Sequence, residues 1–222
     1  AKALAEAAHI VELKVDNNRV VVAPMEPRAA LGDYDSVDNS FTLHVCSQGT
    51  HKLAAPLATC LNVTPGSLRV LTGDVGGAFG MKNFLFHEYV LVLAAARRLR
   101  CPVKWTADRS ESFVSDLQGR DRVMTGRMAF DADHRITGLH VDMISNFGAY
   151  VSSFMPFVAT LASTAVQSMA YAIPAIHTEV RGVLTNTVPI DAYRGAGRPE
   201  TGFMVERLLD KAARRFDMSA AD

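Results

Sequence analysis

The chain has 222 residues, of which 49% are hydrophobic and 21% are charged, so it is long enough to bury the core of one compact domain or of two small ones. Its 23 Lys and Arg residues balance its 23 Asp and Glu residues, which leaves no global field that would hold nucleic acid or an anionic membrane surface. Any anion must therefore be bound by a local arrangement of donors.

The cysteines Cys46, Cys60 and Cys101 are odd in number and lack a Cys-x-x-Cys spacing, which argues against a disulfide framework and against a zinc or iron–sulfur site. We expect reduced and mostly buried thiols. No apolar run approaches the roughly 20 residues that span a bilayer, and the first residues lack the pattern of a signal peptide. The sequence therefore predicts a soluble, cytoplasmic protein.

The first half of the chain is predicted to contain short strands and two helices. The strands are expected at Val11–Val15, Val20–Ala23, Phe41–Cys46, Leu68–Leu71 and Cys101–Thr106. A helix is expected from about His51 to Leu61, with its leucines on one face, and a turn at Thr64–Ser67 follows it. A second helical pattern comes after a glycine-rich loop and contains these apolar residues: Leu85, Tyr89, Val92, Ala96 and Leu99.

The second half is predicted to begin with a hairpin, in which Arg122–Phe130 pairs with Ile136–Asn146 across a short turn. Ile176–Leu184 is a further strand, Thr185–Glu200 a long loop rich in Pro, Gly and Arg, and Thr201–Phe216 a helix. The sequence thus predicts the α+β class, with mixed sheets and packed helices. Residues 1–222 form either one domain or two subdomains that divide near residues 110–120.

The segment Met155–Met169 has two readings. It is apolar with Ala, Ser and Thr interspersed, so it fits either a buried helix or a segment that lines a cavity. Periodicity alone does not decide between these readings, and both stay open.

The glycine-rich loop offers a way to hold an oxyanion. Gly76, Gly77 and Gly80 allow positive φ and close approach, so that backbone N–H groups and the positive end of the following helix can face a ligand. The ordinary alternative is a tight strand-to-helix turn. Two nucleotide-binding motifs are absent. A dinucleotide fingerprint needs its first glycine where Val75 stands, and a phosphate loop needs a lysine directly after Gly80, where Met81 stands.

A second loop, Ala192–Glu200, places Arg194 and Arg198 among glycines just before a helix. Arginine supplies a planar fork of donors for phosphate or oxo groups, whereas a surface turn with solvated arginines is the alternative. Two such loops in one chain predict a bound anion more strongly than either does alone, and we expect both to face one oxyanionic ligand. Gln48, after a predicted strand, adds an amide donor, while the scattered histidines lack the spacing of a metal site.

Five segments are more specific together than any one of them is alone: Met25–Ala30, Cys46–Gly49, Gly76–Gly80, Asp108–Glu111 and Ala192–Glu200. Their order and spacing resemble the molybdopterin-binding large subunit of the xanthine dehydrogenase, aldehyde oxidase and carbon monoxide dehydrogenase family, over nearly the whole chain. The resemblance implies a pterin cofactor whose dithiolene sulfurs hold molybdenum, in some members extended to a cytosine dinucleotide. The protein then need not supply metal ligands of its own.

The resemblance also implies roles for individual residues. Those expected to contact the cofactor are Gln48, Gly76, Gly77, Ala78, Phe79, Gly80, Arg194, Gly195, Ala196 and Gly197. Among them, Gln48 would hydrogen-bond an oxo ligand of molybdenum, Phe79 would pack beneath the metal centre and Arg194 would line the cofactor. The residues expected in the substrate pocket are Asn83, Met155 and Ala196.

Three departures from the family pattern narrow the implied substrate. Asn83 stands where purine-oxidising members place a glutamate, and no arginine occurs near Thr160, where those members place a pocket arginine. Gly195 stands where carbon monoxide dehydrogenases carry a cysteine. The resemblance therefore implies oxidation of an aldehyde or an N-heterocycle, by attack of Mo–OH on carbon and hydride transfer to a sulfido or oxo ligand.

The chain begins with Ala1 and has no counterpart of the family's general-base glutamate, which we expect beyond Asp222. We therefore expect a fragment that is inactive alone and works with the remainder of the large subunit, a small-molecule substrate, and 2Fe-2S and FAD partners in an oligomer. The alternative is a non-catalytic assembly or anion-binding module of the same fold. A nucleotide-binding oxidoreductase is disfavoured by the loop spacing.

Overall fold

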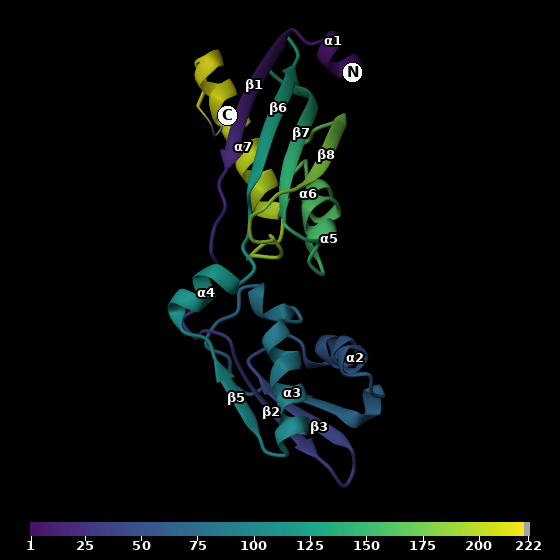
Figure 1. The fold of residues 1–222 in the computed structure, drawn as a ribbon. Helices are drawn as coiled ribbons and strands as arrows, with labels where there is room; N and C mark the ends of the chain where they lie inside the picture. Colours follow the sequence, from purple (N-terminus) through teal and green to yellow (C-terminus); the bar gives the residue numbers. More distant parts are fainter. Residues whose placement is uncertain (220–222) are drawn as a thin grey trace. The chain divides into compact units, whose positions relative to one another are not determined.

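The computed structural model describes residues 1–219, which fall into two compact units (Figure 1). Unit 1 consists of Ala1–Val20 and the residues from Gln118 onward, and unit 2 consists of Val21–Leu117. Each unit is built on one four-stranded sheet, and each sheet contains one parallel pair among antiparallel pairs. The predicted α+β class with mixed sheets is therefore confirmed.

Unit 2 has the strand order β4-β3-β2-β5. Its strands are β2 (Ala29–Asp35), β3 (Ser40–Val45), β4 (Leu68–Leu71) and β5 (Val103–Thr106). Its helices are α2 (Thr50–Leu61), α3 (His87–Leu99) and α4 (Arg109–Ser115), with the short 3₁₀ turns η1 (Pro65–Ser67) and η2 (Met81–Asn83). Helix α3 packs so closely on β2 that a Cβ at Gly32 would lie 2.8 Å from the backbone of Val92.

Unit 1 has the strand order β1-β6-β7-β8. Its strands are β1 (His9–Asn17), β6 (Arg122–Phe130), β7 (Ile136–Gly148) and β8 (Ile176–Leu184). Its helices are α1 (Lys2–Ala5), α5 (Met155–Ala159), α6 (Leu161–Thr164) and α7 (Arg198–Phe216). Strand β6 is antiparallel to both of its neighbours, β1 and β7, and β8 runs parallel to β7.

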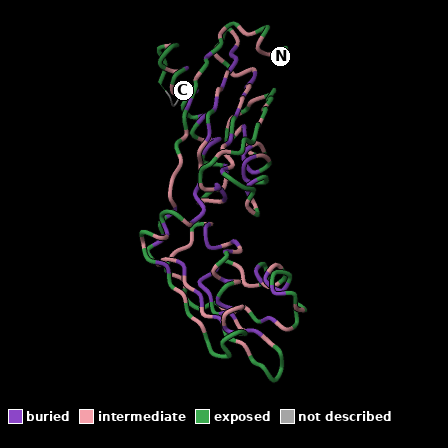
Figure 2. Tube along the Cα trace, in the orientation of Figure 1, coloured by how far each residue is buried: buried purple, intermediate pink, exposed green. Residues whose placement is uncertain are grey.

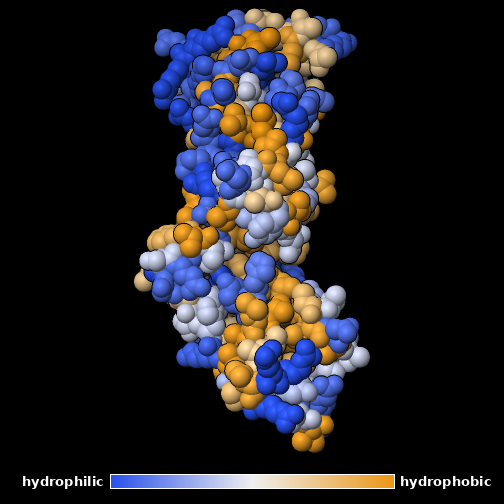
Figure 3. Space-filling view, in the orientation of Figure 1, coloured by the Kyte–Doolittle hydropathy of each residue, from blue (hydrophilic) through white to orange (hydrophobic). Residues whose placement is uncertain are grey.

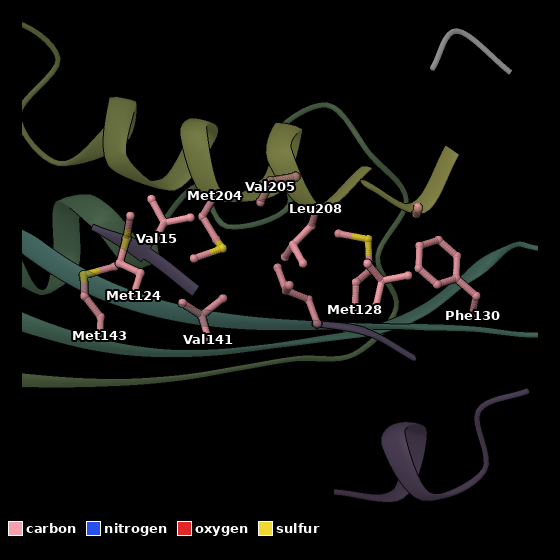
Figure 4. Close-up of a cluster of buried hydrophobic side chains, with 12 residues drawn as sticks. Val15, Met124, Met128, Phe130, Val141, Met143, Met204, Val205 and Leu208 are labelled. Carbon is pink, nitrogen blue, oxygen red and sulfur yellow. The ribbon is translucent and has the colours of Figure 1, made fainter. Parts of the chain in front are cut away.

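The core of unit 1 lies between its sheet and α7 (Figure 4). Met204, Val205 and Leu208 of α7 point at side chains from three strands, among them Met124 and Val141. Along β1 and β6, buried residues alternate with less buried ones (Figure 2). This arrangement is the amphipathic pattern from which the helix and the hairpin were predicted.

Three local predictions were wrong. Val20–Ala23 is not a strand, because Ala23 has a φ of +44° that breaks the extended backbone, and only Val20 forms an isolated bridge, to Gly119. Helix α3 begins at His87, so Leu85 precedes it. The thiols are free, but Cys46 alone is buried, whereas the other two cysteines, at positions 60 and 101, are exposed.

None of the helices among residues 1–219 is long and apolar enough to cross a membrane. On the face drawn in Figure 3, apolar and charged residues are interspersed.

Candidate cofactor-binding site

The glycine loop of unit 2 lies between β4 and η2 and has a left-handed backbone at three positions. The φ angles are +95° at Gly77, +52° at Phe79 and +105° at Gly80. A Cβ at Gly76 would lie 2.7 Å from Cβ of Glu26, so that position has no room for a side chain. Phe79 adopts its conformation at a cost of about 1 kcal/mol or more, and such strained residues are concentrated at functional sites.

The loop leaves three consecutive backbone donors unused. The N–H of Gly76 donates to Oε2 of Glu26 at 2.8 Å. The N–H of Gly80 donates to Oε1 of Gln48 at 2.8 Å. For the N–H groups of residues 77, 78 and 79 between them, residues 1–219 supply no acceptor. A ligand with oxygen or nitrogen acceptors would find these donors free in an exposed loop.

Gln48 is exposed and held in one orientation. Its backbone N–H donates to the carbonyl of Lys82 at 3.0 Å, and its Oε1 accepts the N–H of Gly80. Because the amide oxygen is engaged, the amide NH₂ is the group left to bind something else, and it is a donor only. Gln48 and the glycine loop therefore form one donor-rich surface within unit 2.

A partly buried ion pair between Lys82 and Glu26 supports the glycine loop. Lys82 is fully buried and its Nζ lies 2.7 Å from Oε2 of Glu26, the oxygen that also accepts the N–H of Gly76. The N–H of Glu26 donates in turn to the carbonyl of Gly76 at 3.0 Å. Burial raises the pKa of Glu26, but hydrogen bonds from Lys82 and Gly76 outweigh burial and hold its pKa below the ordinary value.

The role of this pair was missed by sequence reasoning. Glu26 lies in the segment Met25–Ala30 and Lys82 follows the glycine loop, but nothing in the spacing of the two residues connects them. A lysine with no exposed surface needs a buried acceptor, and burial becomes visible only in the structure.

Asn83 follows the same loop and is partly buried. Its Oδ1 is buried and finds no donor among residues 1–219, and it lies 3.5 Å from where a Cβ on Gly49 would be. A buried acceptor without a partner is costly unless a ligand or water supplies a donor. Asn83 was predicted to line the substrate pocket, and that role stays a prediction.

The second glycine loop belongs to unit 1 and ends at α7. Gly195, Ala196 and Gly197 have φ angles of +96°, +49° and +92°. A Cβ on Gly197 would lie 2.5 Å from the carbonyl oxygen of Val158. Arg194 is exposed, and its guanidinium has no partner among residues 1–219. The loop therefore presents the cation of Arg194 on a backbone whose positive φ angles are favoured by glycine at positions 195 and 197.

Arg120 stabilises this loop through hydrogen bonds to its backbone. Its guanidinium donates to the carbonyl of Arg194 at 2.8 Å and to that of Tyr193 at 3.3 Å, and it lies over the Tyr193 ring. Glu200, buried in the first turn of α7, lies 3.3 Å from Arg120 and 3.5 Å from Arg122. Burial lowers the pKa of Arg122, and the charge of Glu200 opposes that effect. Sequence reasoning did not identify these arginines.

Asp191 fixes the start of the loop. Its carboxylate accepts hydrogen bonds from the hydroxyl of Ser152 and from the N–H groups of Phe154 and Ala192. Burial raises its pKa, while these hydrogen bonds act to lower it. Met155, which was predicted to line the pocket, is fully buried at the start of α5.

The predicted site residues thus fall into two groups. Gln48, the glycine loop and Asn83 come together in unit 2, whereas Met155 and the loop of Arg194 belong to unit 1. That both glycine loops face one ligand stays a prediction. The donor sets themselves fit a ligand that is rich in oxyanions and other acceptors.

The sequence profile of the molybdopterin cofactor-binding domain matches residues 1–222. The chain belongs to this family. It is 34% identical over its full length to the 6-hydroxypseudooxynicotine dehydrogenase complex subunit gamma of Paenarthrobacter nicotinovorans. It is 30% identical over 92% of its length to a carbon monoxide dehydrogenase large chain of Hydrogenophaga pseudoflava.

Quinoline 2-oxidoreductase from Pseudomonas putida 86 has a similar structure, with a TM-score of 0.92 and 31% identity over 99% of this chain. The chain spans 28% of the length of the Paenarthrobacter subunit and 26% of the carbon monoxide dehydrogenase chain. It spans 28% of the quinoline 2-oxidoreductase chain. The resemblance to molybdenum hydroxylase large subunits that the motifs predicted is therefore confirmed.

Proposed function

We propose that this chain supplies part of the molybdopterin site and of the substrate pocket of a molybdenum hydroxylase that oxidises aldehydes or N-heterocycles. Membership of the molybdopterin-binding family supports the cofactor, and the similarity to an enzyme named for its action on quinoline supports the substrate class. Since the chain spans 28% of that enzyme's chain, the activity is proposed for the whole subunit.

The observation that carries the proposal is the row of unused donors beside Gln48. The N–H groups of Gly77, Ala78 and Phe79 would donate to acceptor atoms of the cofactor, and the NH₂ of Gln48 would donate to an oxygen ligand of its metal. Arg194 would neutralise an oxyanion of the cofactor. When bound, the molybdenum centre supplies the two-electron chemistry by which oxygen from water is added to the substrate carbon.

Asn83 supports an uncharged or weakly basic substrate. Its amide is neutral, so it offers hydrogen bonds without the charge that a glutamate would bring to this position. Its Oδ1 is an acceptor in need of a donor, which a substrate that carries an N–H or O–H group, or a water molecule bound beside the substrate, would supply. Asn83 in place of a glutamate and the absence of an arginine near Thr160 disfavour purines, and Gly195 in place of cysteine disfavours carbon monoxide.

The whole enzyme would need components that this chain does not carry. Two electrons must leave the metal after each turnover, and 2Fe-2S and FAD groups on partner domains or subunits would remove them. The general-base glutamate would come from the remainder of the large subunit, so residues 1–222 alone would not turn over. A cytosine dinucleotide form of the cofactor and a cytoplasmic location complete the proposal.

Metal and pterin analysis of the intact enzyme, purified with its partner subunits, tests the proposal. We expect stoichiometric molybdenum by mass spectrometry and a fluorescent pterin after oxidation. Quinoline or an aromatic aldehyde should reduce an artificial dye, while hypoxanthine and carbon monoxide should react far more slowly. An active preparation with neither molybdenum nor pterin would reject the proposed function, and a preference for hypoxanthine would reject the substrate class alone.

A further inference from the structure

The two edge strands of the unit 1 sheet differ in whether side chains cover their outward-facing backbone groups. At one edge, carbonyl oxygens of β1 accept hydrogen bonds from α7: the carbonyl of Glu12 accepts from Lys211 at 2.7 Å, and that of Ile10 accepts from Arg215 at 2.6 Å. Side chains that cover an edge strand in this way block its pairing with another chain. The opposite edge is β8, and among residues 1–219 no side chain caps its backbone.

The outward-facing backbone groups of β8 can be identified from its two ends. The carbonyl of Ala175 accepts the N–H of Leu139 at 2.8 Å, and the N–H of Thr185 donates to the carbonyl of Gly148 at 2.9 Å. Odd-numbered residues of β8 therefore face β7, because N–H and C=O groups alternate in direction along a strand. The residues whose backbone groups point outward are Ile176, Thr178, Val180, Gly182 and Leu184.

Strand β8 is also long and exposed for an edge. It has nine residues, contains no proline and has a mostly exposed pattern, with Leu184 64% exposed. The edge strands of unit 2, β4 and β5, have four residues each, and short edges pair poorly. Of the four sheet edges among residues 1–219, β8 is therefore the one open to pairing.

We propose that β8 pairs with β8 of a second copy of this chain, antiparallel and about a two-fold axis at Val180. In this register the outward-facing residues form the hydrogen-bonded pairs. Glu179 lies opposite Arg181 of the partner, and the symmetry repeats this pair of opposite charges. At the ends, Ile176 lies opposite Leu184, so two exposed apolar residues cover each other.

The charges also select this register. A slip of two residues in one direction would place Glu179 opposite its own copy, and a slip in the other direction would do the same to Arg181. Both side chains are exposed, at 57% for Glu179 and 62% for Arg181, and they form an ion pair with each other at 3.7 Å within the strand, to which the two charges of a partner strand would be added. Like charges directly opposite destabilise a strand pair, whereas opposite charges stabilise it. This self-complementarity favours a second copy over an unrelated strand.

The experiment is sedimentation velocity of the chain over a range of concentrations, with charge-reversed variants. We expect the wild type to form a dimer. Glu179→Arg and Arg181→Glu, each alone, should weaken the dimer about tenfold or more, because each makes both ion pairs repulsive. The double variant should regain the wild-type affinity. Lys14→Glu, an exposed charge reversal on the capped strand β1, is the matched control and should change nothing.

An equimolar mixture of the two single variants provides a test that misfolding could not imitate. The Glu179→Arg variant carries two positive charges at positions 179 and 181, and the Arg181→Glu variant carries two negative charges there. Because these charges attract each other, the mixture should form a heterodimer. A wild type that stays monomeric, a dimer that both single variants leave intact, or a mixture that does not associate would overturn the proposal. The backbone amides of β8 can also be followed by hydrogen exchange in the intact subunit. If they are protected there, and the charge variants do not change dimerisation of that subunit, then β8 pairs with another strand of the same subunit and the proposal is wrong.

Discussion

At the residue scale, the glycine loop depends on one residue, Glu26, which makes three contacts. Glu26 accepts from Lys82 and from Gly76, and its own N–H donates back to Gly76. This arrangement fixes the loop while leaving the donors after Gly76 free. The two partners differ in burial, since Lys82 is fully buried and the Glu26 side chain is 37% exposed. Removing one or the other should therefore have unequal effects.

Glu26→Gln should destabilise the protein more than Lys82→Met does. The glutamine variant leaves a buried ammonium group without its counter-charge, at a cost of about 2 kcal/mol, less than for a fully buried pair because water reaches position 26. The methionine variant leaves only a carboxylate that water can solvate, at a cost of about 1 kcal/mol or less. Urea denaturation measures both, and a larger loss for Lys82→Met would contradict the account.

The same pair predicts a pH dependence. The pKa of Glu26 is lower in the folded protein than its value of 4.5 in the unfolded chain. Its contribution to stability is therefore fully present above the unfolded pKa and is lost as the pH falls through the folded pKa. The difference in unfolding free energy between wild type and Glu26→Gln should be constant near neutral pH and shrink below about pH 4.5. A difference that grows on acidification would refute this assignment.

At the scale of elements, the strands and helices with clear periodicity were predictable. The strand Ile176–Leu184 was predicted with its observed bounds, and the helix from about His51 to Leu61 differs from α2 by one residue. Helix α7 starts earlier than predicted, at Arg198, because Gly197 ends the loop and Pro199 suits the first turn. Glu200 is buried there by arginines about eighty residues away in the chain, a pairing that no local pattern reveals.

The start of α7 supplies an element-scale prediction. Gly197→Ala should cost about 2–4 kcal/mol, because it combines a φ of +92° with a Cβ 2.5 Å from the carbonyl of Val158. Gly66→Ala is the control, since a Cβ there meets nothing within 4 Å and the φ is not positive. The control should be neutral or slightly stabilising. Thermal unfolding of both variants checks this, and equal effects would show that the loop tolerates a side chain.

At the scale of the whole molecule, the motifs predicted the family, but the positions of the functional groups in space became visible only in the structure. The order and spacing of five short segments were enough to identify a molybdopterin-binding domain, because the five together are more specific than any one of them is alone. The division into units was less accessible: unit 1 takes residues from both ends of the chain and unit 2 is inserted after Val20.

The central claim is that the free N–H groups of Gly77, Ala78 and Phe79, together with the NH₂ of Gln48, bind the molybdenum cofactor. A structure of the intact, cofactor-loaded enzyme tests it most directly. We predict that acceptor atoms of the cofactor or of its metal's oxygen ligands lie within about 3.2 Å of the Gln48 amide nitrogen and of at least one of these backbone nitrogens. A cofactor bound elsewhere, with this loop left in solvent, would contradict it.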